Sequence, residues 1–188
     1  MGKLIYFMHT SMDGFVADPN GGMGWIHIDD ELFEYVGNRV KTTDTALYGR
    51  VTFEMMEAYW PTAAQKPAAT KHDIDHSSWY AKARKAVLSR SLQGKELPNT
   101  QFISNNLKDE ISKLKASTPN DILLFGSPSA AHSLLAEDLI DGYWFFVNPI
   151  LLGKGIPLFK NITDITKLKL ISTKVFASGV VSLSYEKE

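Results

Sequence analysis

Cysteine is absent from this 188-residue sequence, and its absence excludes several kinds of chemistry at once. The chain cannot form disulfide bonds, thiolate nucleophiles or metal sites with cysteine ligands. The chain also lacks a charge surplus, because 20 Lys and Arg residues stand against 21 Asp and Glu residues. A net charge of -1 gives no basic excess for general phosphate-backbone binding, so we expect no nucleic-acid partner.

Long hydrophobic runs are also missing. Apolar residues follow Lys3 only from Leu4 to Met8, which is too short for the core of a signal peptide. The most apolar stretch, 143–152, contains Asn148 and Pro149 and is well short of membrane-spanning length. We therefore expect a cytoplasmic protein with no membrane association.

The sequence does contain short apolar segments that alternate with amphipathic ones. Strands are predicted over residues 4–8, 46–48, 86–88, 101–103, 121–125, 143–147, 168–176 and 180–185. Helices are predicted over 29–40, 51–59, 74–85, 108–116 and 129–137, with loops over 10–24 and 61–70. This order predicts one α/β domain spanning 1–188, with a mainly parallel central sheet, flanking helices and an antiparallel C-terminal edge.

A first candidate binding turn joins the strand that ends near Tyr48 to the helix that follows it. In an open α/β sheet, ligands bind beyond the carboxyl ends of the strands, where helix N-termini present unpaired N–H groups. Gly49 permits close approach of a ligand, Arg50 adds a fixed charge and Thr52 adds a hydroxyl. The pattern indicates phosphate binding, and the alternative is an ordinary strand-to-helix turn.

A second candidate turn, Gly126-Ser127-Pro128-Ser129, has the same position after a later strand. Its small residues let a ligand reach the backbone, and Pro near the first helical turn loses no needed donor. Ser89 and Arg90 follow a third strand and could hold a ribose phosphate. The alternatives are an ordinary turn for the first of these two segments and a solvated loop for the second.

Familiar motifs of other enzyme classes are absent. No Gly-x-Gly-x-x-Gly follows a strand, no Gly-Lys-Ser/Thr is present, and the turn at Gly126 lacks the final Gly of a nucleophile elbow. His72 and His76 have helical i, i+4 spacing that suits a transition metal, but an exposed helix start with Asp caps is the better explanation, because the pair follows a loop rich in Pro and Ala. We therefore assign no metal site. The other histidines are isolated and fit core or surface roles: His9, His27 and His132.

Several segments, taken in order, resemble the dihydrofolate reductase-like superfamily. They are SMDGFVAD, GMGW, LYGRVTFE, VLSR and LLFGSPSAAHSLLAEDLIDGYWFFVNPILLGKGIPLF. The resemblance is closest to the C-terminal reductase domain of bacterial riboflavin biosynthesis enzymes and its stand-alone relatives. It implies a three-layer fold, NADPH across the carboxyl edge of the sheet, and hydride transfer to a small heterocycle. That heterocycle would resemble 5-amino-6-(5-phosphoribosylamino)uracil or dihydrofolate.

The resemblance also implies roles for single residues. It places the cofactor phosphates on one turn, the adenosine 2′-phosphate at the next strand end, and the pyrophosphate or nicotinamide side at the small-residue turn. In that order, the residues are Gly49, Arg50 and Thr52; Ser89 and Arg90; and Gly126, Ser127 and Ser129. The family usually has Gly-Gly where this chain has Gly126-Ser127, which puts the cofactor affinity in question.

Two carboxylates are candidates for the catalytic acid. Hydride addition to a C=N bond needs a proton, and a buried carboxyl with a raised pKa can supply it. Glu31 best matches the Asp-Leu-x-x-Phe pattern of dihydrofolate reductases, although a solvent-facing Glu in a first helical turn is the alternative. Asp13 is the rival, with an Asx-type turn before Gly14 as its alternative. If neither carboxyl acts, water delivers the proton.

The aromatic run Tyr143 to Phe146 predicts a homodimer, because it carries more aromatic surface than one side of a small sheet covers. The resemblance points the same way. Two other function classes stay open at this point: a nucleotide-binding module without turnover, and a metal-dependent enzyme that uses His72 and His76.

Overall fold

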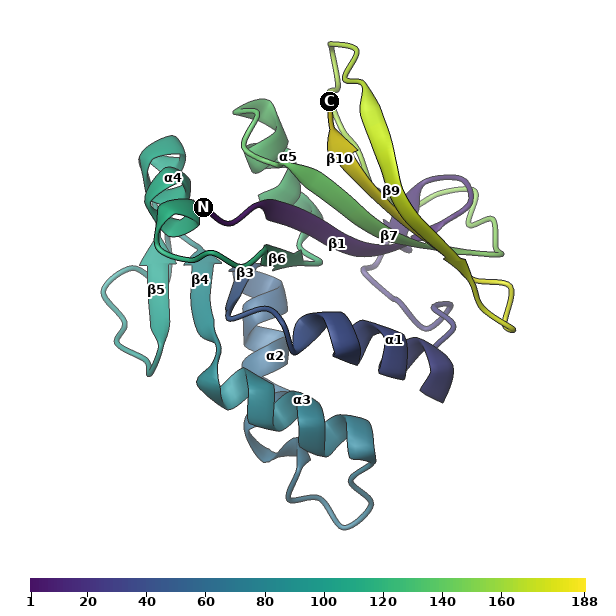
Figure 1. Ribbon diagram of the computed structural model, residues 1–188, viewed down its shortest axis with the longest axis horizontal. Helices are drawn as coiled ribbons and strands as arrows, with labels where there is room; N and C mark the ends of the chain where they lie inside the picture. Colours follow the sequence, from purple (N-terminus) through teal and green to yellow (C-terminus); the bar gives the residue numbers. More distant parts are fainter.

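The computed structural model describes residues 1–188, in which strands and helices alternate (Figure 1). The elements are β1 (Leu4–Ser11), β2 (Phe15–Ala17), α1 (Asp30–Val40), β3 (Thr45–Gly49), α2 (Arg50–Ala63), α3 (Lys71–Lys82), β4 (Arg84–Leu88), β5 (Thr100–Ile103), α4 (Leu107–Ala116), β6 (Ile122–Phe125), α5 (Pro128–Ala136), β7 (Gly142–Asn148), β8 (Ile156–Pro157), β9 (Leu168–Val175) and β10 (Val181–Lys187). The main sheet has the order β5-β4-β3-β6-β1-β7-β10-β9. Only the pairs β7–β10 and β10–β9 are antiparallel, so the predicted sheet is confirmed.

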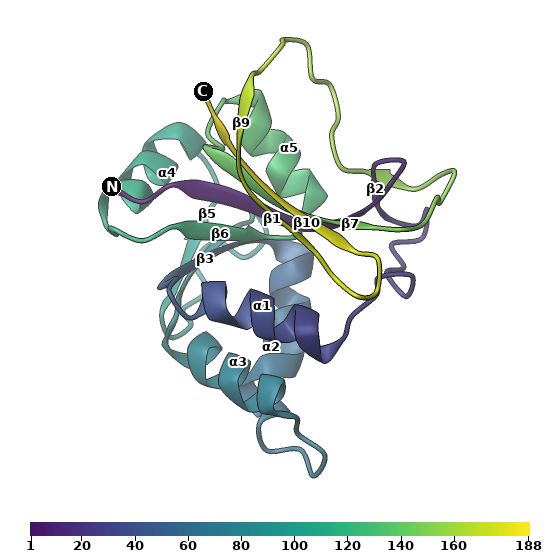
Figure 2. The ribbon, with the colours of Figure 1, turned by 45° about the vertical axis from the view of Figure 1, so that its right-hand side comes forward.

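The central strands β3, β6, β1 and β7 are buried on both faces because they are apolar at most positions, whereas the edge strand β9 is largely exposed. Along β1, Leu4, Tyr6 and Met8 enter the hydrophobic cluster that contains the apolar residues of α4 and α5. Ile5 enters the cluster that contains those of α1, α2 and α3. Figures 1 and 2 show these two groups of helices on opposite faces of the sheet. The result is the expected three-layer arrangement.

Helix boundaries differ from the predicted ones where local hydrogen bonds decide them. α3 begins at Lys71 rather than Ile74 because Thr70 and Asp73 form a capping box, with Thr70 Oγ1 accepting from Asp73 N at 3.1 Å. α2 continues through Pro61, which was expected to open a loop, and ends soon after it at Ala63. No helix of the structure is both long enough and apolar enough to cross a membrane.

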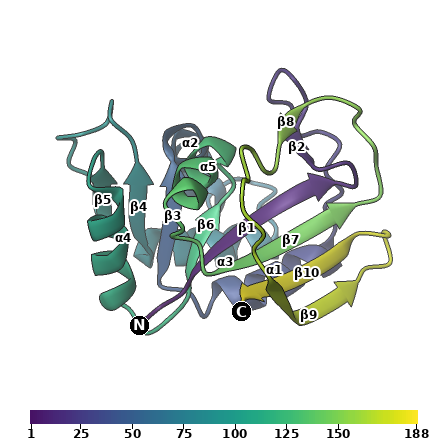
Figure 3. The same cartoon turned by 90° about the horizontal axis from the view of Figure 1, so that it is seen from above.

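The segment 10–24, expected to be one long loop, contains a short strand. β2 pairs antiparallel with β8, which follows a turn at Gly153, where φ is 72°. Figure 3 shows this small pair beyond the tip of β1. Two segments far apart in the sequence therefore form a cover near the carboxyl ends of the central strands.

The aromatic run on β7 is buried within the chain. Tyr143 and Phe145 belong to one hydrophobic cluster, and Trp144 and Phe146 belong to the cluster on the other face. None of the four is more than 9% exposed. The expected exposed aromatic surface is therefore wrong, since a strand in mid-sheet buries both of its faces. The homodimer stays a prediction that rests on the resemblance alone.

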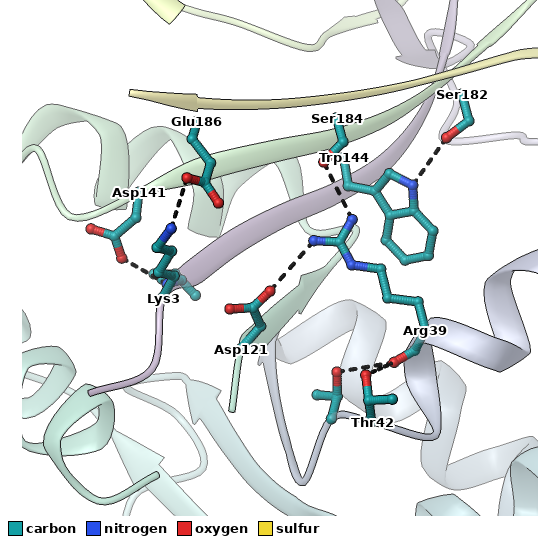
Figure 4. Close-up of polar contacts among 11 residues, drawn as sticks. Lys3, Arg39, Thr42, Asp121, Asp141, Trp144, Ser182, Ser184 and Glu186 are labelled. Carbon is teal, nitrogen blue, oxygen red and sulfur yellow. Dashed lines mark hydrogen bonds and ion pairs between the residues drawn. The ribbon is translucent and has the colours of Figure 1, made fainter. Parts of the chain in front are cut away.

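Polar side chains close the amino ends of the parallel strands (Figure 4). The Arg39 guanidinium lies 4.4 Å from the centre of the Trp144 ring and donates to Ser184 Oγ at 3.4 Å and Asp121 Oδ2 at 3.5 Å. Lys3 Nζ pairs with Glu186 at 2.7 Å. These contacts connect α1 to the middle strands of the sheet and to β10.

Candidate functional site

Two strand-to-helix connections, the segment that joins β4 to β5, and the end of β1 lie at the carboxyl edge of the sheet. There β3 ends at Gly49, β4 at Leu88 and β6 at Phe125, and each is followed directly by one of the predicted binding segments. Because these strands are parallel neighbours, their carboxyl ends point the same way (Figure 3). Such an edge is where open α/β sheets bind ligands.

The connection from β3 to α2 has no linker residue. Gly49 is the N-cap of α2 and makes no side-chain cap. A Cβ at Gly49 would lie 2.9 Å from both Cβ and Oγ of Ser127 and 3.2 Å from Cβ of Ala130. Only glycine lets the two turns approach this closely. The first-turn N–H groups of α2 are left without a side-chain partner, as ligand-binding helix N-termini require.

The connection from β6 to α5 is held in an uncommon backbone conformation. Gly126 and Ser127 have φ of 55° and 56°, a left-handed region that costs a non-glycine residue energy. The Ser127 hydroxyl compensates with two hydrogen bonds: Oγ accepts from Gly49 N at 2.8 Å and donates to Thr52 Oγ1 at 2.7 Å. Ser127 therefore locks the two predicted turns side by side, which brings Gly49, Thr52 and Gly126 together. Ser129 is exposed in the first turn of α5.

The two arginines of the predicted site are in different situations. Arg50 pairs with Glu54 one helical turn along α2, at 2.8 Å, so its charge is partly offset. Arg90 is exposed and forms no ion pair or side-chain hydrogen bond in the structure. Its neighbour Ser89 is buried, and its Oγ accepts from Leu92 N at 3.1 Å, so this hydroxyl holds the local turn. Of this pair, only Arg90 has its polar group available to a ligand.

Asp13 is a connector between loops. Its carboxylate accepts from Ser11 Oγ at 2.6 Å, Leu152 N at 3.1 Å and Gly153 N at 2.7 Å. These bonds, with the Ser11 hydroxyl as the largest cause, lower the pKa of Asp13. The expected raised pKa is therefore wrong for Asp13. The side chain fastens the β1–β2 turn to the segment that leads into β8.

Glu31 is likewise not held in its protonated form. Its Oε1 pairs with Lys174 Nζ on β9 at 2.8 Å, and its Oε2 accepts from Ala177 N at 3.4 Å. The Lys174 hydrogen bond is the largest cause of a lowered pKa, so a raised pKa is wrong for Glu31 as well. The exposed carboxylate fastens the first turn of α1 to the β9–β10 turn.

His72 and His76 are part of an aromatic stack between helices. The His72 ring stacks on Phe33 at 3.8 Å between centroids, and the His76 ring lies 4.0 Å from that of Trp60. Burial lowers the pKa of both imidazoles, that of His76 to about 3. No group of three His, Cys, Asp or Glu side chains with the geometry of a metal site occurs in the structure. The expected helix start with an Asp cap is confirmed by the Thr70–Asp73 capping box, but the expected exposure is wrong for the two histidines, whose rings pack against neighbouring helices.

Sequence reasoning missed two residues at this edge. Asn148, at the end of β7, is buried, accepts from His27 N at 2.9 Å and donates to Phe146 O at 3.1 Å. It holds the loop before α1 against the sheet. His9, near the end of β1, stacks on Phe146 with 4.9 Å between ring centroids. An isolated histidine gives no sequence signal, and only its place at a strand end distinguishes it.

The family follows from comparison with known proteins. Residues 2–182 match the model of the RibD C-terminal domain. The chain belongs to the RibD C-terminal domain family. The uncharacterized protein YyaP of Bacillus subtilis strain 168 is 32% identical over 187 residues, which cover 97% of this chain and 94% of YyaP.

Solved structures agree with this RibD C-terminal fold. A putative riboflavin biosynthesis protein from Shewanella sp. PV-4 superposes with a TM-score of 0.72 at 24% identity, covering 99% of both chains. A dihydrofolate reductase from Enterococcus faecalis, complexed with NADP(H), superposes with a TM-score of 0.63 at 13% identity, covering 99% of this chain and 96% of that one. At these identities the likeness establishes the dihydrofolate reductase-like fold, as the resemblance implied, and a reductase type of enzyme is the function that family and fold suggest.

Proposed function

We propose that this protein is an NADPH-dependent reductase of a small heterocyclic substrate. The observation that carries the proposal is the pair of helix N-termini at the carboxyl edge, α2 and α5, locked side by side by Ser127. Unpaired N–H groups and the helix dipoles favour bound phosphate at such a place. Membership of the RibD C-terminal domain family supports the same assignment.

The residues present fit the cofactor. Gly49 lets the Ser127 turn pack directly against it, Gly126 adopts the left-handed backbone of its turn, and Thr52 adds a hydroxyl between the turns. Arg50 would reach the phosphates from the first turn of α2, and Ser129 from that of α5. Arg90 would bind the 2′-phosphate, with Ser89 shaping its turn. NADPH, when bound, supplies a hydride.

The chain's own contribution to the reaction is positional. Asp13, Asn148 and Glu31 each fasten a loop or a helix start around the carboxyl edge, so they would hold the cover over the substrate and limit the access of water. Neither carboxyl is held in the protonated form that a proton donor needs. We therefore propose that water delivers the proton to the reduced ring. A substrate like 5-amino-6-(5-phosphoribosylamino)uracil or dihydrofolate, and a homodimeric cytoplasmic enzyme, complete the proposal.

The experiment is a fluorescence titration with NADPH, followed by NADPH oxidation assays with pyrimidine and pteridine acceptors. Gly49→Ala is the diagnostic variant, because its Cβ would force the two turns apart. Binding that is lost in Gly49→Ala, together with oxidation in the wild type, supports the proposal. Tight binding without oxidation by any acceptor would favour the nucleotide-binding module, and absence of NADPH binding to the wild type would refute both.

A further inference from the structure

Buried polar atoms without a partner gather at the carboxyl ends of β1 and β7. Five such side-chain atoms occur in the structure, and two of them, the hydroxyls of Tyr6 and Tyr48, lie within strands of the core. The other three are His9 Nδ1, Trp25 Nε1 and Ser178 Oγ. Each unpaired buried group costs about 1–3 kcal/mol, so a cluster of them needs an explanation.

The three segments that carry these atoms converge on the end of β7. The His9 ring lies against Phe146 at an interplanar angle of 23°. The loop of Trp25 is fastened to Asn148 through His27 N. The β9–β10 turn, which contains Ser178, approaches Pro149, the residue after Asn148. A Cβ on Gly179 in this turn would lie 3.4 Å from Pro149 Cγ. Figure 3 shows the tips of β1 and β7 beside that turn.

His9 is the member of this group best suited to meet a ligand. The residue as a whole is partly exposed although its Nδ1 is buried, and neither of its nitrogens has a hydrogen-bond partner in the structure. Burial of the ring lowers its pKa to about 4, so the imidazole is neutral near pH 7 and offers one donor and one acceptor. Aromatic rings surround it: Phe7 at 6.0 Å and Phe146 at 4.9 Å, with Tyr35 and Phe176 packed behind Phe146.

The two carboxylates considered as acids, those of Glu31 and Asp13, are already used. Glu31 is paired with Lys174, and Asp13 holds the backbone of Leu152 and Gly153. Neither carboxylate is therefore available to pair with a substrate whose ring is protonated. Flat aromatic walls and neutral donors or acceptors suit a planar ring without charge.

We propose that His9 contacts the acceptor substrate, and that the ring of this substrate is an uncharged planar heterocycle with an N–H or carbonyl that hydrogen-bonds to the imidazole. The inference rests on the proposed reductase function, which places the acceptor at this edge. Beyond the proposed function, the inference names the residue that hydrogen-bonds to the substrate ring and states that this ring is uncharged. Trp25 Nε1 and Ser178 Oγ are further donors available at the same end of the sheet.

The test uses lumazine, an uncharged pteridine, and 2,4-diaminopyrimidine, a ring that protonates readily, as binding probes at pH 7. His9→Phe keeps a flat ring and removes both nitrogens, and His9→Asn keeps a donor and an acceptor. His27→Asn, an exposed histidine of the nearby loop, is the matched control. We expect the lumazine Kd to rise about tenfold in His9→Phe, less in His9→Asn, and not at all in His27→Asn. NADPH affinity stays at the wild-type value in all three.

Equal lumazine affinity in the wild type and in folded His9→Phe and His9→Asn would overturn the role of His9. Tighter binding of diaminopyrimidine than of lumazine, or no lumazine binding at millimolar concentration, would overturn the charge class. Circular dichroism establishes that each variant is folded. Lumazine binding that depends on His9 in a protein that does not bind NADPH would refute the proposed function and leave the role of His9 standing.

Discussion

The two ends of the parallel strands are built differently. At the amino end, polar side chains satisfy one another: Asp44 accepts from Thr118 Oγ1 at 2.9 Å and Asn120 Nδ2 at 2.9 Å, and buried Lys115 pairs with Asp141 at 2.6 Å. At the carboxyl end, two consecutive residues, Gly126 and Ser127, have left-handed backbone, and three buried polar atoms have no partner.

The difference separates stability from binding. Paired polar groups hold the strands in place, whereas unpaired groups and strained backbone lower stability and persist where a ligand can use them. The amino end thus supplies the rigid frame on which the carboxyl end keeps its open groups. This division between an amino end that stabilises the fold and a carboxyl end that binds the ligand can be tested by mutation.

Asp141→Ala should have the largest effect, and on stability alone. The change leaves the Lys115 side chain, 10% exposed, without its anion and removes the acceptor of Leu4 N. We expect the free energy of unfolding to fall by about 3 kcal/mol in urea denaturation, because an unpaired buried charge is costly. Glu186→Ala, which breaks the exposed pair with Lys3, is the control and should cost under about 1 kcal/mol. A folded Asp141→Ala protein with weakened NADPH binding would contradict the division.

Two substitutions of Ser127 distinguish the effect of backbone strain on stability from that of the side-chain hydrogen bonds at the carboxyl end. Ser127→Ala keeps the left-handed strain and leaves Gly49 N without its acceptor, so we expect a loss of about 2 kcal/mol in stability. Ser127→Gly removes the strain and should cost about 1 kcal/mol or less. NADPH affinity should be kept in Ser127→Gly, because the released N–H can bind phosphate. Lower stability in the Gly variant than in the Ala variant would show that the backbone at this turn is not strained.

Arg90 and Arg50 test whether an unpaired charge binds better than a paired one. Loss of a charge-assisted hydrogen bond to phosphate should weaken NADPH binding to Arg90→Ala about tenfold, with little effect on NADH. Arg50→Ala should have a smaller effect, since Arg50 already pairs with Glu54. Fluorescence titration of both cofactors against both variants measures this. Equal affinity of the wild type for NADPH and NADH would remove the role of Arg90.

Acid should destabilise the carboxyl end through His9. The unfolded chain protonates this residue near its ordinary pKa of 6.5, whereas burial holds the folded pKa at about 4. The unfolded state therefore binds more protons between those values, and stability, complete above pH 6.5, falls toward pH 4. One such histidine contributes a slope of about 1.4 kcal/mol per pH unit. His76 adds to the wild-type slope, so His9→Phe should reduce it without abolishing it. Identical slopes in urea denaturation at pH 4.5 to 6.5 would contradict the assignment.

The sequence predicts the fold better than it predicts the site. Alternating apolar strands and helices determine the sheet, because burial of those residues leaves few other arrangements. The pairing of β2 with β8 could not be predicted from the sequence, because it joins segments far apart in the chain. The hydrogen bond from Gly153 N to Asp13, which holds these segments together, exists only in the folded chain. The same is true of the Ser127 bridge to Gly49 and Thr52, which exists only once the two turns meet.

The predicted protonation or exposure of a residue was wrong where a contact from a distant part of the chain sets that property. The sequence around Glu31 matches the family's pattern for a catalytic acid. In the fold, however, Lys174 and the backbone of Ala177, both from the β9–β10 hairpin, bind its carboxylate. The aromatic run on β7 suggested a surface, but the strand lies in mid-sheet. His9 was predicted to have a core or surface role, because an unpaired nitrogen is a property of the packed chain that the sequence does not show.

Glu31→Gln should have the smallest effect. A general acid must carry its proton near neutral pH, whereas the Lys174 hydrogen bond lowers the pKa of Glu31 and keeps it ionised. The ion pair therefore stabilises the protein fully above the ordinary Glu31 pKa of 4.5, and this stability is lost as the pH falls through the lowered pKa. Gln keeps the size of the side chain and an acceptor for Ala177 N, so we expect wild-type NADPH affinity and turnover.

Lys174→Ala is the matched control, because it removes the same ion pair from the other side. Equal and small effects of the two changes would show that Glu31 only positions the start of α1. Loss of turnover in Glu31→Gln by a factor on the order of a hundred, with NADPH binding kept and Lys174→Ala active, would instead make Glu31 the proton donor. The carboxyl end would then carry its own acid, and water would no longer be needed to deliver the proton.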